Sequence, residues 1–309
     1  MLSEYVCSHG IQHVGEILEQ KGEYSAVDCT YCGFVHVVPF PSEEELAEYY
    51  HSKFYESDRK KDYFAQQAAD REWWCDVFQN RLLKFENALG RKGRILDVGC
   101  GPGFFLNHAS KAGWDVKGIE PSPRAVEFAR TELTVDVEQG GLDSFSPESL
   151  GKFDVVYSHG VIEHVLRPDD FIKQCGEFLM KGGLLFVNAA NDFNPLQNAL
   201  CSKLSYSPWW FVPPEHLNYF SVKSIQGLVE RLGFQPVYCE TSFPLELFLL
   251  MGDNYLDDPV LGKACHRKRV AFEANMEKAG LGQLKQKIYE SFAALGLGRQ
   301  LDLLAQKVS

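Results

Sequence analysis

Short apolar, β-branched runs alternate with amphipathic segments through the middle of the chain. The apolar runs at 94–98, 115–120, 135–138, 153–158 and 184–189 predict strands, and the segments at 103–112, 122–132 and 169–180 predict helices between them. Strands separated by helices in this way are typical of a parallel sheet that is covered on both faces. The pattern therefore predicts an α/β fold with a doubly wound, mostly parallel sheet.

The first 90 residues have a different pattern. Residues 1–41 are rich in Cys, His and Gly and contain short alternating runs such as "FVHVV", which predict a small β-rich unit. Ser42 and Glu45 have the spacing of a capping box at the start of a helix. A longer amphipathic helix is predicted over much of 59–89, with adjacent Trp73 and Trp74 as packing residues.

The C-terminal part is predicted to be mainly helical. An aromatic and proline-containing loop at 191–220 precedes a helix at 221–232 and a strand that begins at Phe234. Residues 245–298 are predicted to be mainly helical, and the last segment fits either an extension of that helix or an antiparallel strand. These patterns divide the chain into units at 1–41, 42–92, 93–241 and 242–309.

A glycine-rich loop follows the first strand of the predicted sheet, in "ILDVGCGPGFF" at 95–105. A dinucleotide fingerprint would require a further glycine where Phe104 stands, and no G-K-[ST] of a phosphate-binding loop follows. Asp97 ends the first strand and Glu120 ends the second. Asp97 suits an ammonium group, and Glu120 suits the hydroxyls of an unphosphorylated ribose. The loop is therefore predicted to hold an adenosyl amino acid.

Four segments in order, "ILDVGCGPGFFL", "GIEPS", "LDSF" and "KFDVVYSHGVIEHV", resemble motifs of the class I S-adenosylmethionine-dependent methyltransferases over about residues 93–240. The resemblance implies a Rossmann-like, seven-stranded sheet with S-adenosylmethionine as the cofactor. By this resemblance, the methionine part of the cofactor would lie against Asp97, Gly99, Gly101 and Gly103. The ribose would lie against Glu120 and Pro121, and the adenine against Asp143 and Ser144. The pocket would be closed by Ser158 and His159.

The N-terminal unit contains candidate metal ligands. Cys29 and Cys32 stand two residues apart before a glycine, and "VCSHG" supplies Cys7 and His9 upstream. Three sulfurs and one imidazole would complete a structural, tetrahedral zinc site. His13 or His36 could replace His9, and buried reduced cysteines are the alternative. This zinc-ribbon-like arrangement resembles the zinc-binding segment ahead of some methyltransferases that act on nucleotide-linked sugars.

Methyl transfer by in-line displacement requires alignment and, where the acceptor is protonated, a general base. The candidates are Glu163 and His164 after the fourth strand and Glu215 and His216 in "PPEHLNYFS". A Glu-His pair in such a loop resembles the sugar C-methyltransferases, in which a histidine is the base. His216 could instead order the loop, and His164 could be a packing residue. The "WWF" at 209–211 is predicted to form either a lid or core.

Charge and composition limit the classes of partner that the protein is expected to bind. The chain has 309 residues, nine cysteines and a formal net charge of −11. This charge repels nucleic acid, and the most basic run, "HRKRV" at 266–270, is predicted to form a solvated helix face. No apolar run is long enough to cross a bilayer, and the N-terminus has no export signal, so we expect a cytoplasmic protein with free thiols.

These observations together predict S-adenosylmethionine-dependent methylation of a small molecule, such as a sugar or a nucleotide-linked sugar. Neither a nucleic acid nor a membrane is expected as a partner, and the sequence does not indicate the oligomeric state. A non-catalytic module that binds the cofactor and recruits a partner through its zinc-binding segment is one alternative. Methylation of RNA or protein is the other, and Phe104 disfavours a nicotinamide-dependent oxidoreductase.

Overall fold

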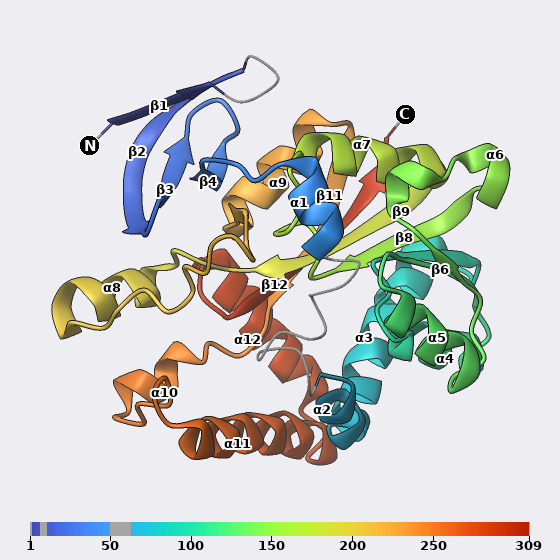
Figure 1. Ribbon diagram of the computed structural model, residues 1–309. Coiled ribbons are helices and arrows are strands. Elements are labelled where there is room, and N and C mark those ends of the chain that lie inside the picture. The colour runs from blue at the N-terminus through green and yellow to red at the C-terminus, as the bar shows by residue number, and fades with distance from the viewer. Residues whose placement is uncertain (1, 7–10, 50–62, 309) are drawn as a thin grey trace.

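The computed structural model of the protein describes residues 2–6, 11–49 and 63–308. It contains two β-sheets (Figure 1). The larger sheet has seven strands in the order β11-β12-β9-β8-β5-β6-β7. In chain order its strands are β5 (Arg94–Val98), β6 (Asp115–Glu120), β7 (Val137–Gln139), β8 (Phe153–His159), β9 (Leu179–Ala190), β11 (Phe234–Thr241) and β12 (Gln300–Lys307). The predicted seven-stranded sheet is confirmed.

The strand pairing shows the secondary structure of residues 300–307. The five strands from β5 to β9 pair in parallel. Strand β12 lies antiparallel between β9 and β11. The last segment is therefore a strand and not an extension of the preceding helix, because insertion between two strands satisfies its backbone groups on both edges. The sheet is mostly parallel, as predicted.

Helices cover both faces of this sheet, since alternate side chains of each central strand point to opposite faces. On one face Val155 and Tyr157 pack with buried residues of α3 and α4, and on the other face Val156 packs with α7 and α9. The helices beside the sheet are α3 (Arg71–Leu89), α4 (Phe104–Lys111), α5 (Pro123–Thr131), α6 (Pro147–Leu150), α7 (Pro168–Phe178), α9 (Val222–Arg231) and α12 (Gly282–Ala294). The doubly wound arrangement is confirmed.

The smaller sheet joins the N-terminal unit to the rest of the protein. Its antiparallel strands are β1 (Leu2–Val6), β2 (Gln12–Lys21), β3 (Tyr24–Cys29), β4 (Phe34–Val38) and β10 (Asn218–Tyr219). Strand β10 belongs to the loop that follows Trp209 to His216, and Val37 N donates to Leu217 O at 2.9 Å. Phe34 packs on Phe220 with ring centroids 5.0 Å apart. The unit is therefore continuous with the main core.

Between the two sheets the chain forms α1 (Glu43–Glu48), and α2 (Tyr63–Ala69) precedes α3. The capping box at α1 is present as predicted, with Glu45 N donating to Ser42 Oγ at 3.1 Å and Ser42 N donating to Glu45 Oε2 at 2.8 Å. The helix predicted over 59–89 is two helices within the described residues. Its first residues lie outside the described part of the chain.

The remaining helices are α8 (Pro195–Leu204), α10 (Glu246–Leu250) and α11 (Pro259–Lys278). In Figure 1, α8 projects at the left of the view, and α10 and α11 lie at its lower side. Contacts from α3 hold α11 in place, because Trp73 Nε1 donates to Glu273 Oε2 at 2.6 Å and His266 Nε2 lies 2.8 Å from Asp70 Oδ2. Across the described residues, no helix combines the length and apolar character that crossing a membrane requires.

Candidate functional site

A hollow of about 2140 Å³ opens at the carboxyl ends of the central parallel strands. Strands β6 and β8 lie on either side of β5, so the strand order reverses next to β5. Ligands of open α/β sheets bind at this reversal. Since single small-molecule pockets measure roughly 300–1,000 Å³, the hollow has room for a cofactor and an acceptor together.

The glycine loop brings backbone to the edge of the hollow. Gly99 lines it with a φ of +73°, and a Cβ there would lie 2.5 Å from Val161 Cγ2. Gly101 also lines the hollow and donates its N–H to Glu120 Oε2 at 2.9 Å. Gly103 does not reach it: this residue caps α4, where a Cβ would lie 2.9 Å from Val135. Gly103 therefore serves helix packing and not the predicted cofactor contact.

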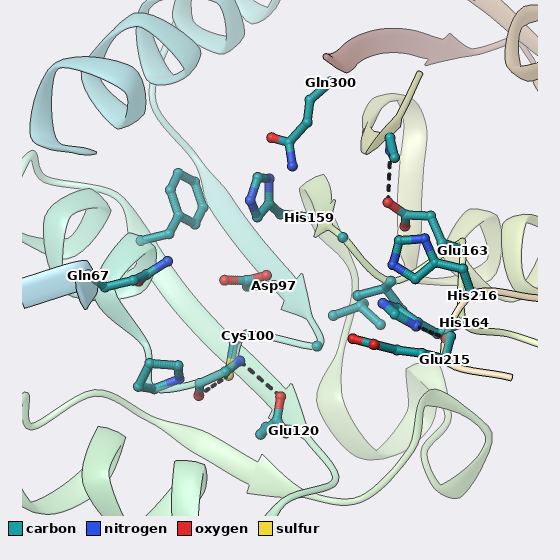
Figure 2. Close-up of a pocket in the computed structure, with 18 of the residues that line it drawn as sticks. Gln67, Asp97, Cys100, Glu120, His159, Glu163, His164, Glu215, His216 and Gln300 are labelled. Atoms are coloured by element: carbon teal, nitrogen blue, oxygen red, sulfur yellow. Dashed lines mark hydrogen bonds between the residues drawn. The ribbon is translucent and has the colours of Figure 1, made fainter. Parts of the chain in front are cut away.

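Two buried carboxylates border the hollow (Figure 2). Asp97 is 2% exposed and Glu120 is 5% exposed. Burial raises the pKa of Glu120 to about 7, against the hydrogen bonds that its carboxylate accepts from Ser122 N and Gly101 N. Burial, with the nearby charge of Glu120, also raises the pKa of Asp97 well above its usual range. A ligand with hydroxyl and ammonium donors would stabilise both ionised forms.

Four further predicted residues line the hollow, namely Pro121, Asp143, Ser144 and His159. Asp143 and Ser144 belong to a 3₁₀ turn (Leu142–Ser144) beside β7. Ser158 differs from the prediction, because its side chain is fully buried on β8 and does not line the hollow. Side chains alternate along a strand, so Ser158 and His159 point to opposite faces.

Sequence analysis missed a buried charge beneath His159. Arg81 of α3 forms a double hydrogen bond with Asp302 at 2.8 and 2.9 Å and donates to Tyr157 Oη at 2.6 Å. The same guanidinium lies 3.3 Å from His159 Nδ1. An arginine on the apolar face of the helix predicted over 59–89 was the available signal, since a buried cation requires a partner. Arg81 therefore orients the wall of the hollow.

The predicted catalytic residues also meet at the hollow. His164, Glu215 and His216 all line it, and the two imidazole rings contact edge to face with centroids 4.9 Å apart. His164 Nδ1 lies 2.6 Å from the carbonyl oxygen of Glu215. This contact requires a proton on Nδ1 and leaves the lone pair on Nε2 in the neutral ring.

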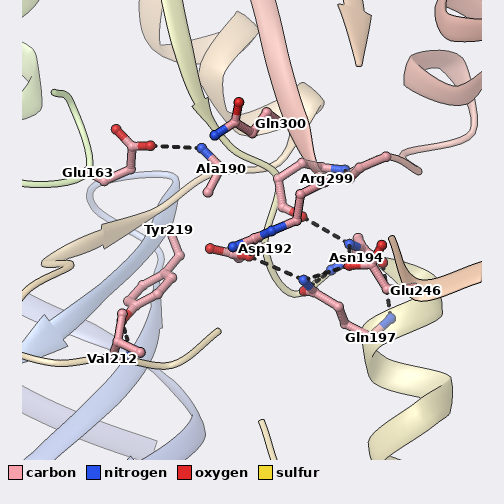
Figure 3. A network of polar contacts seen from close by, with 12 residues as sticks. Glu163, Ala190, Asp192, Asn194, Gln197, Val212, Tyr219, Glu246, Arg299 and Gln300 are labelled. Atoms are coloured by element: carbon pink, nitrogen blue, oxygen red, sulfur yellow. Dashed lines mark hydrogen bonds and ion pairs between the residues drawn. The ribbon is translucent and has the colours of Figure 1, made fainter. Parts of the chain in front are cut away.

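Glu163 connects the loops that carry these residues (Figures 2 and 3). Its Oε1 accepts from Ala190 N at 2.8 Å, and its backbone carbonyl accepts from Leu217 N at 2.8 Å and Asn218 N at 3.0 Å. Asn218 Nδ2 donates to Val165 O at 2.6 Å. Residues 163–165 and 216–218 therefore form one bonded unit, in which Glu163 has a positioning role.

A second buried network supports the start of β12 (Figure 3). Arg299 Nη1 lies 2.6 Å from Asp192 Oδ1, and Gln197 Nε2 donates to Asp192 at 3.2 Å and to Glu246 at 3.1 Å. Arg299 and the adjacent Gln300 both line the hollow. Figure 2 shows the Gln300 amide beside His159. Neither residue was predicted, because β12 enters the sheet from the far end of the chain.

Aromatic side chains contribute on two sides. Trp209 and Trp210 line the hollow, while Phe211 is buried against Tyr219. Phe211 therefore belongs to the core, whereas Trp209 lines the hollow. Trp210 does both, since it lines the hollow and is only 3% exposed. Trp73 and Trp74 do more than pack, because both line the hollow.

The N-terminal sheet carries a compact group of metal-ligating side chains. Ligand atoms of His13, Cys29, Cys32 and His36 all lie within 4.8 Å of one another. His13 Nδ1 is 3.6 Å from Cys29 Sγ and 3.5 Å from Cys32 Sγ. A hydrogen bond from Cys32 is the main cause that lowers the pKa of the Cys29 thiol. Cys7 and His9 lie outside the described residues.

His36 has the arrangement of a metal ligand. Its Nδ1 lies 3.0 Å from the carbonyl oxygen of Val37, and its Nε2 is buried with no hydrogen-bond partner in the described part of the chain. An imidazole that donates from one nitrogen presents the other as a free lone pair, which is the usual second-shell arrangement of a metal-bound histidine. The four side chains therefore fit a tetrahedral ion such as zinc.

Curated proteins similar to this chain are named ubiquinone biosynthesis O-methyltransferase. The protein from Methylocella silvestris is 36% identical over 103 residues, 32% of this chain and 40% of that protein. The protein from Xanthomonas axonopodis pv. citri is 31% identical over 154 residues, 45% of this chain and 63% of that protein. The chain thus spans between two fifths and two thirds of these two relatives.

A solved structure of the plantazolicin methyltransferase BpumL in complex with SAH has a TM-score of 0.52 against this chain. The alignment covers 85% of this chain and 94% of that protein at 17% identity, so it establishes a shared fold. The family described as "Methyltransferase domain" matches residues 63–238, which is more than half of the chain. With the strand order and the glycine loop above, the match confirms the resemblance to class I methyltransferases, and the chain belongs to the methyltransferase domain family.

Proposed function

We propose that the protein transfers a methyl group from S-adenosylmethionine to a small-molecule acceptor, with His216 as the general base. One observation carries the proposal. A glycine backbone without phosphate-binding features lies beside two buried carboxylates at one edge of the sheet, and two imidazoles from other loops line the same hollow.

The cofactor side supports this proposal through its hydrogen-bonding capacity. Each oxygen of Glu120 accepts one backbone N–H and keeps a second lone pair, which suits the two ribose hydroxyls. The buried carboxylate of Asp97 points into the hollow in Figure 2, where it would accept from an ammonium group. Asp143 and Ser144 would lie beside the adenine.

S-adenosylmethionine, when bound, supplies an electrophilic methyl group on a sulfonium. The walls of the hollow would exclude water and hold an acceptor hydroxyl in line with that methyl group. The hydroxyl proton would pass to the imidazole of His216 as the oxygen–carbon bond forms, and the electron pair of the broken sulfur–carbon bond would stay on sulfur. His164 and Glu215, which contact each other, would fix the loop that carries His216.

The cofactor assignment is tested by calorimetry with S-adenosylhomocysteine. Glu120→Ala removes hydrogen bonds to a charged acceptor, each worth about 1.5–3 kcal/mol, so we expect at least about a hundredfold weaker binding. Glu138→Ala is the control, since it removes a carboxylate from the adjacent strand, outside the hollow, and should leave the affinity within about twofold. No binding to the folded parent protein would contradict the proposal.

The acceptor is tested by a radiolabelled methyl-transfer assay on a panel of small molecules. Sugars, nucleotide-linked sugars and catechols represent the predicted acceptors and the chemistry suggested by the names of the curated relatives. Transfer to any of them supports the enzyme. Binding of S-adenosylhomocysteine with transfer only to RNA or protein would favour a macromolecular substrate instead.

We also propose that His13, Cys29, Cys32 and His36 hold a structural zinc ion. Four ligands would leave no open coordination position, so the ion would stabilise the N-terminal sheet and take no part in the reaction. Metal analysis should find about one zinc per chain, lost in Cys29→Ser and in His36→Ala but retained in Cys7→Ser and His9→Ala. Zinc that depends on Cys7 and His9 would restore the ligand set predicted from sequence, and a parent protein without zinc would exclude the site.

A further inference from the structure

Helix α11 presents cationic side chains to the hollow. Lys263, Arg267 and Arg269 all line it, and the spacing of four residues places Lys263 and Arg267 one turn apart on the same face. The prediction that 266–270 forms a solvated face holds for Lys268, which pairs with Asp253 at 2.8 Å and does not line the hollow. The same basic run therefore has a second face that borders the site.

Among the described residues, these three cations have no ion-pair partner. In the described part of the chain, no carboxylate oxygen lies within 4.0 Å of a side-chain nitrogen of Lys263, Arg267 or Arg269. The other basic groups nearby differ, because His266 is paired with Asp70 at 2.8 Å and Arg299 with Asp192 at 2.6 Å. Lys263 and Arg267 are exposed, and like charges one helical turn apart repel each other by about 0.2–0.5 kcal/mol, so an anion bound between them would stabilise the pair.

Arg269 shows this deficit most clearly. Its Nε is buried with no hydrogen-bond acceptor among the described residues, and its guanidinium lies 4.6 Å from the centre of the Trp73 ring. Its Nη2 contacts His266 Nδ1 at 3.0 Å, and the other nitrogen of that imidazole contacts Asp70 at 2.8 Å. Glu273 accepts from Trp73 Nε1 at 2.6 Å and from Tyr289 Oη at 2.9 Å. A desolvated cation with a free donor is costly to maintain.

The sign of this surface is opposite to that of the protein as a whole. The chain carries a formal net charge of −11, and the carboxylates Asp97 and Glu120 make the cofactor side of the hollow acidic. A cationic wall inside such a molecule concentrates anions at one place. Arginine binds phosphate or carboxylate through paired hydrogen bonds, and lysine adds a point charge.

We propose that the acceptor carries an anionic oxygen group, a phosphate or a carboxylate, that binds Lys263, Arg267 and Arg269. This inference rests on the proposed function, because it assigns the substrate class of the same hollow. It adds a specificity element that lies on α11, apart from the glycine loop and from the loops that carry the imidazoles.

The test is calorimetric titration of the S-adenosylhomocysteine complex with inorganic pyrophosphate and, separately, with succinate, at constant ionic strength. Lys263→Gln/Arg267→Gln should weaken binding of the preferred anion by about tenfold or more, as expected for charge-assisted hydrogen bonds. The matched control is Lys278→Gln/Lys287→Gln, which removes the same charge from exposed positions that do not line the hollow. The control should bind the anion within about twofold of the parent.

Each outcome is informative. Preference for pyrophosphate identifies a phosphate group, and preference for succinate identifies a carboxylate. The proposal is overturned if the complex binds neither anion, or if both double variants lose the same affinity, which would indicate a general charge effect. Failure of the parent protein to bind S-adenosylhomocysteine would instead contradict the proposed function, so the two failures are distinguishable.

Discussion

The two sides of the hollow are built in different ways. The cofactor side comes from consecutive strand ends and turns, from Asp97 to His159, where each short segment places its own residues. The other side, where we propose that the acceptor binds and which we call the acceptor side, is assembled from distant segments by contacts such as Glu163 with Ala190, Asp192 with Arg299 and His266 with Asp70. The first side depends on local backbone geometry and the second on tertiary packing.

Their electrostatics differ as well. The cofactor side holds two buried carboxylates whose pKa values are raised by burial. The acceptor side holds imidazoles and the cations of α11, which have no ion-pair partner among the described residues. The two proposals assign ligands of opposite character to the two sides, one rich in donors and one anionic. A substitution on one side should therefore leave binding on the other side unchanged.

The largest effect is expected from His216→Ala. Loss of a general base typically lowers the rate by about 10²–10⁴-fold, whereas S-adenosylhomocysteine affinity should change by less than about twofold. Turnover with an acceptor from the panel and calorimetry measure the two quantities. His108→Ala is the control, because this imidazole contacts Gln79 and does not line the hollow. Unchanged turnover would remove His216 from the reaction and leave it the role of ordering its loop.

A smaller effect, confined to the cofactor side, is expected from Gly99→Ala. Gly99 and Gly90 have nearly equal φ angles of +73° and +71°, but only at Gly99 would a Cβ meet another atom within 4 Å. Both alanine variants should lose about 1 kcal/mol of stability from the left-handed backbone. Gly99→Ala should lose about 1–3 kcal/mol more by overpacking and bind S-adenosylhomocysteine about 10- to 100-fold more weakly. Equal behaviour in thermal melting and calorimetry would show that the turn tolerates the methyl group.

The smallest effect is a pH dependence of cofactor binding. Because the pKa of Glu120 is raised to about 7 and hydroxyl recognition uses the ionised carboxylate, S-adenosylhomocysteine should bind about tenfold more weakly at pH 6 than at pH 8. Asp97, raised in the same direction, would add to this trend. Glu120→Gln should flatten the profile. A parent affinity that does not change over this range would contradict the role of Glu120.

The same pKa has a consequence for the ligand-free protein. Folded Glu120 retains a proton that the unfolded chain loses near its ordinary pKa of 4.5. Between about pH 4.5 and pH 7 the folded state therefore binds more protons than the unfolded state. The contribution of Glu120 to the free energy of unfolding declines as pH rises through this window. Thermal melting across the range should show this decline in the parent and a weaker one in Glu120→Gln.

Most of the site residues predicted from the sequence lie on the cofactor side, and most of those that were not predicted lie on the acceptor side. Asp97, Gly99, Glu120 and His159 were predicted because strand ends in a parallel sheet share one edge. Ser158 and His159 were both predicted, but adjacent residues of a strand point to opposite faces, and only His159 lines the hollow. In the basic run of α11, Arg267 and Lys268 are exposed as predicted, whereas the contact of Arg269 with Trp73 could not be read from the residues of that helix.

Local sequence patterns were sufficient to predict the doubly wound sheet, the glycine loop and the two carboxylates, since hydrophobic periodicity and turn chemistry act over a few residues. Three features became known from the folded protein alone: the last segment is an inserted strand, Arg81 contacts His159, and His13 and His36 lie beside Cys29 and Cys32. These features depend on contacts between segments far apart in the chain, for which local patterns carry no information about distance.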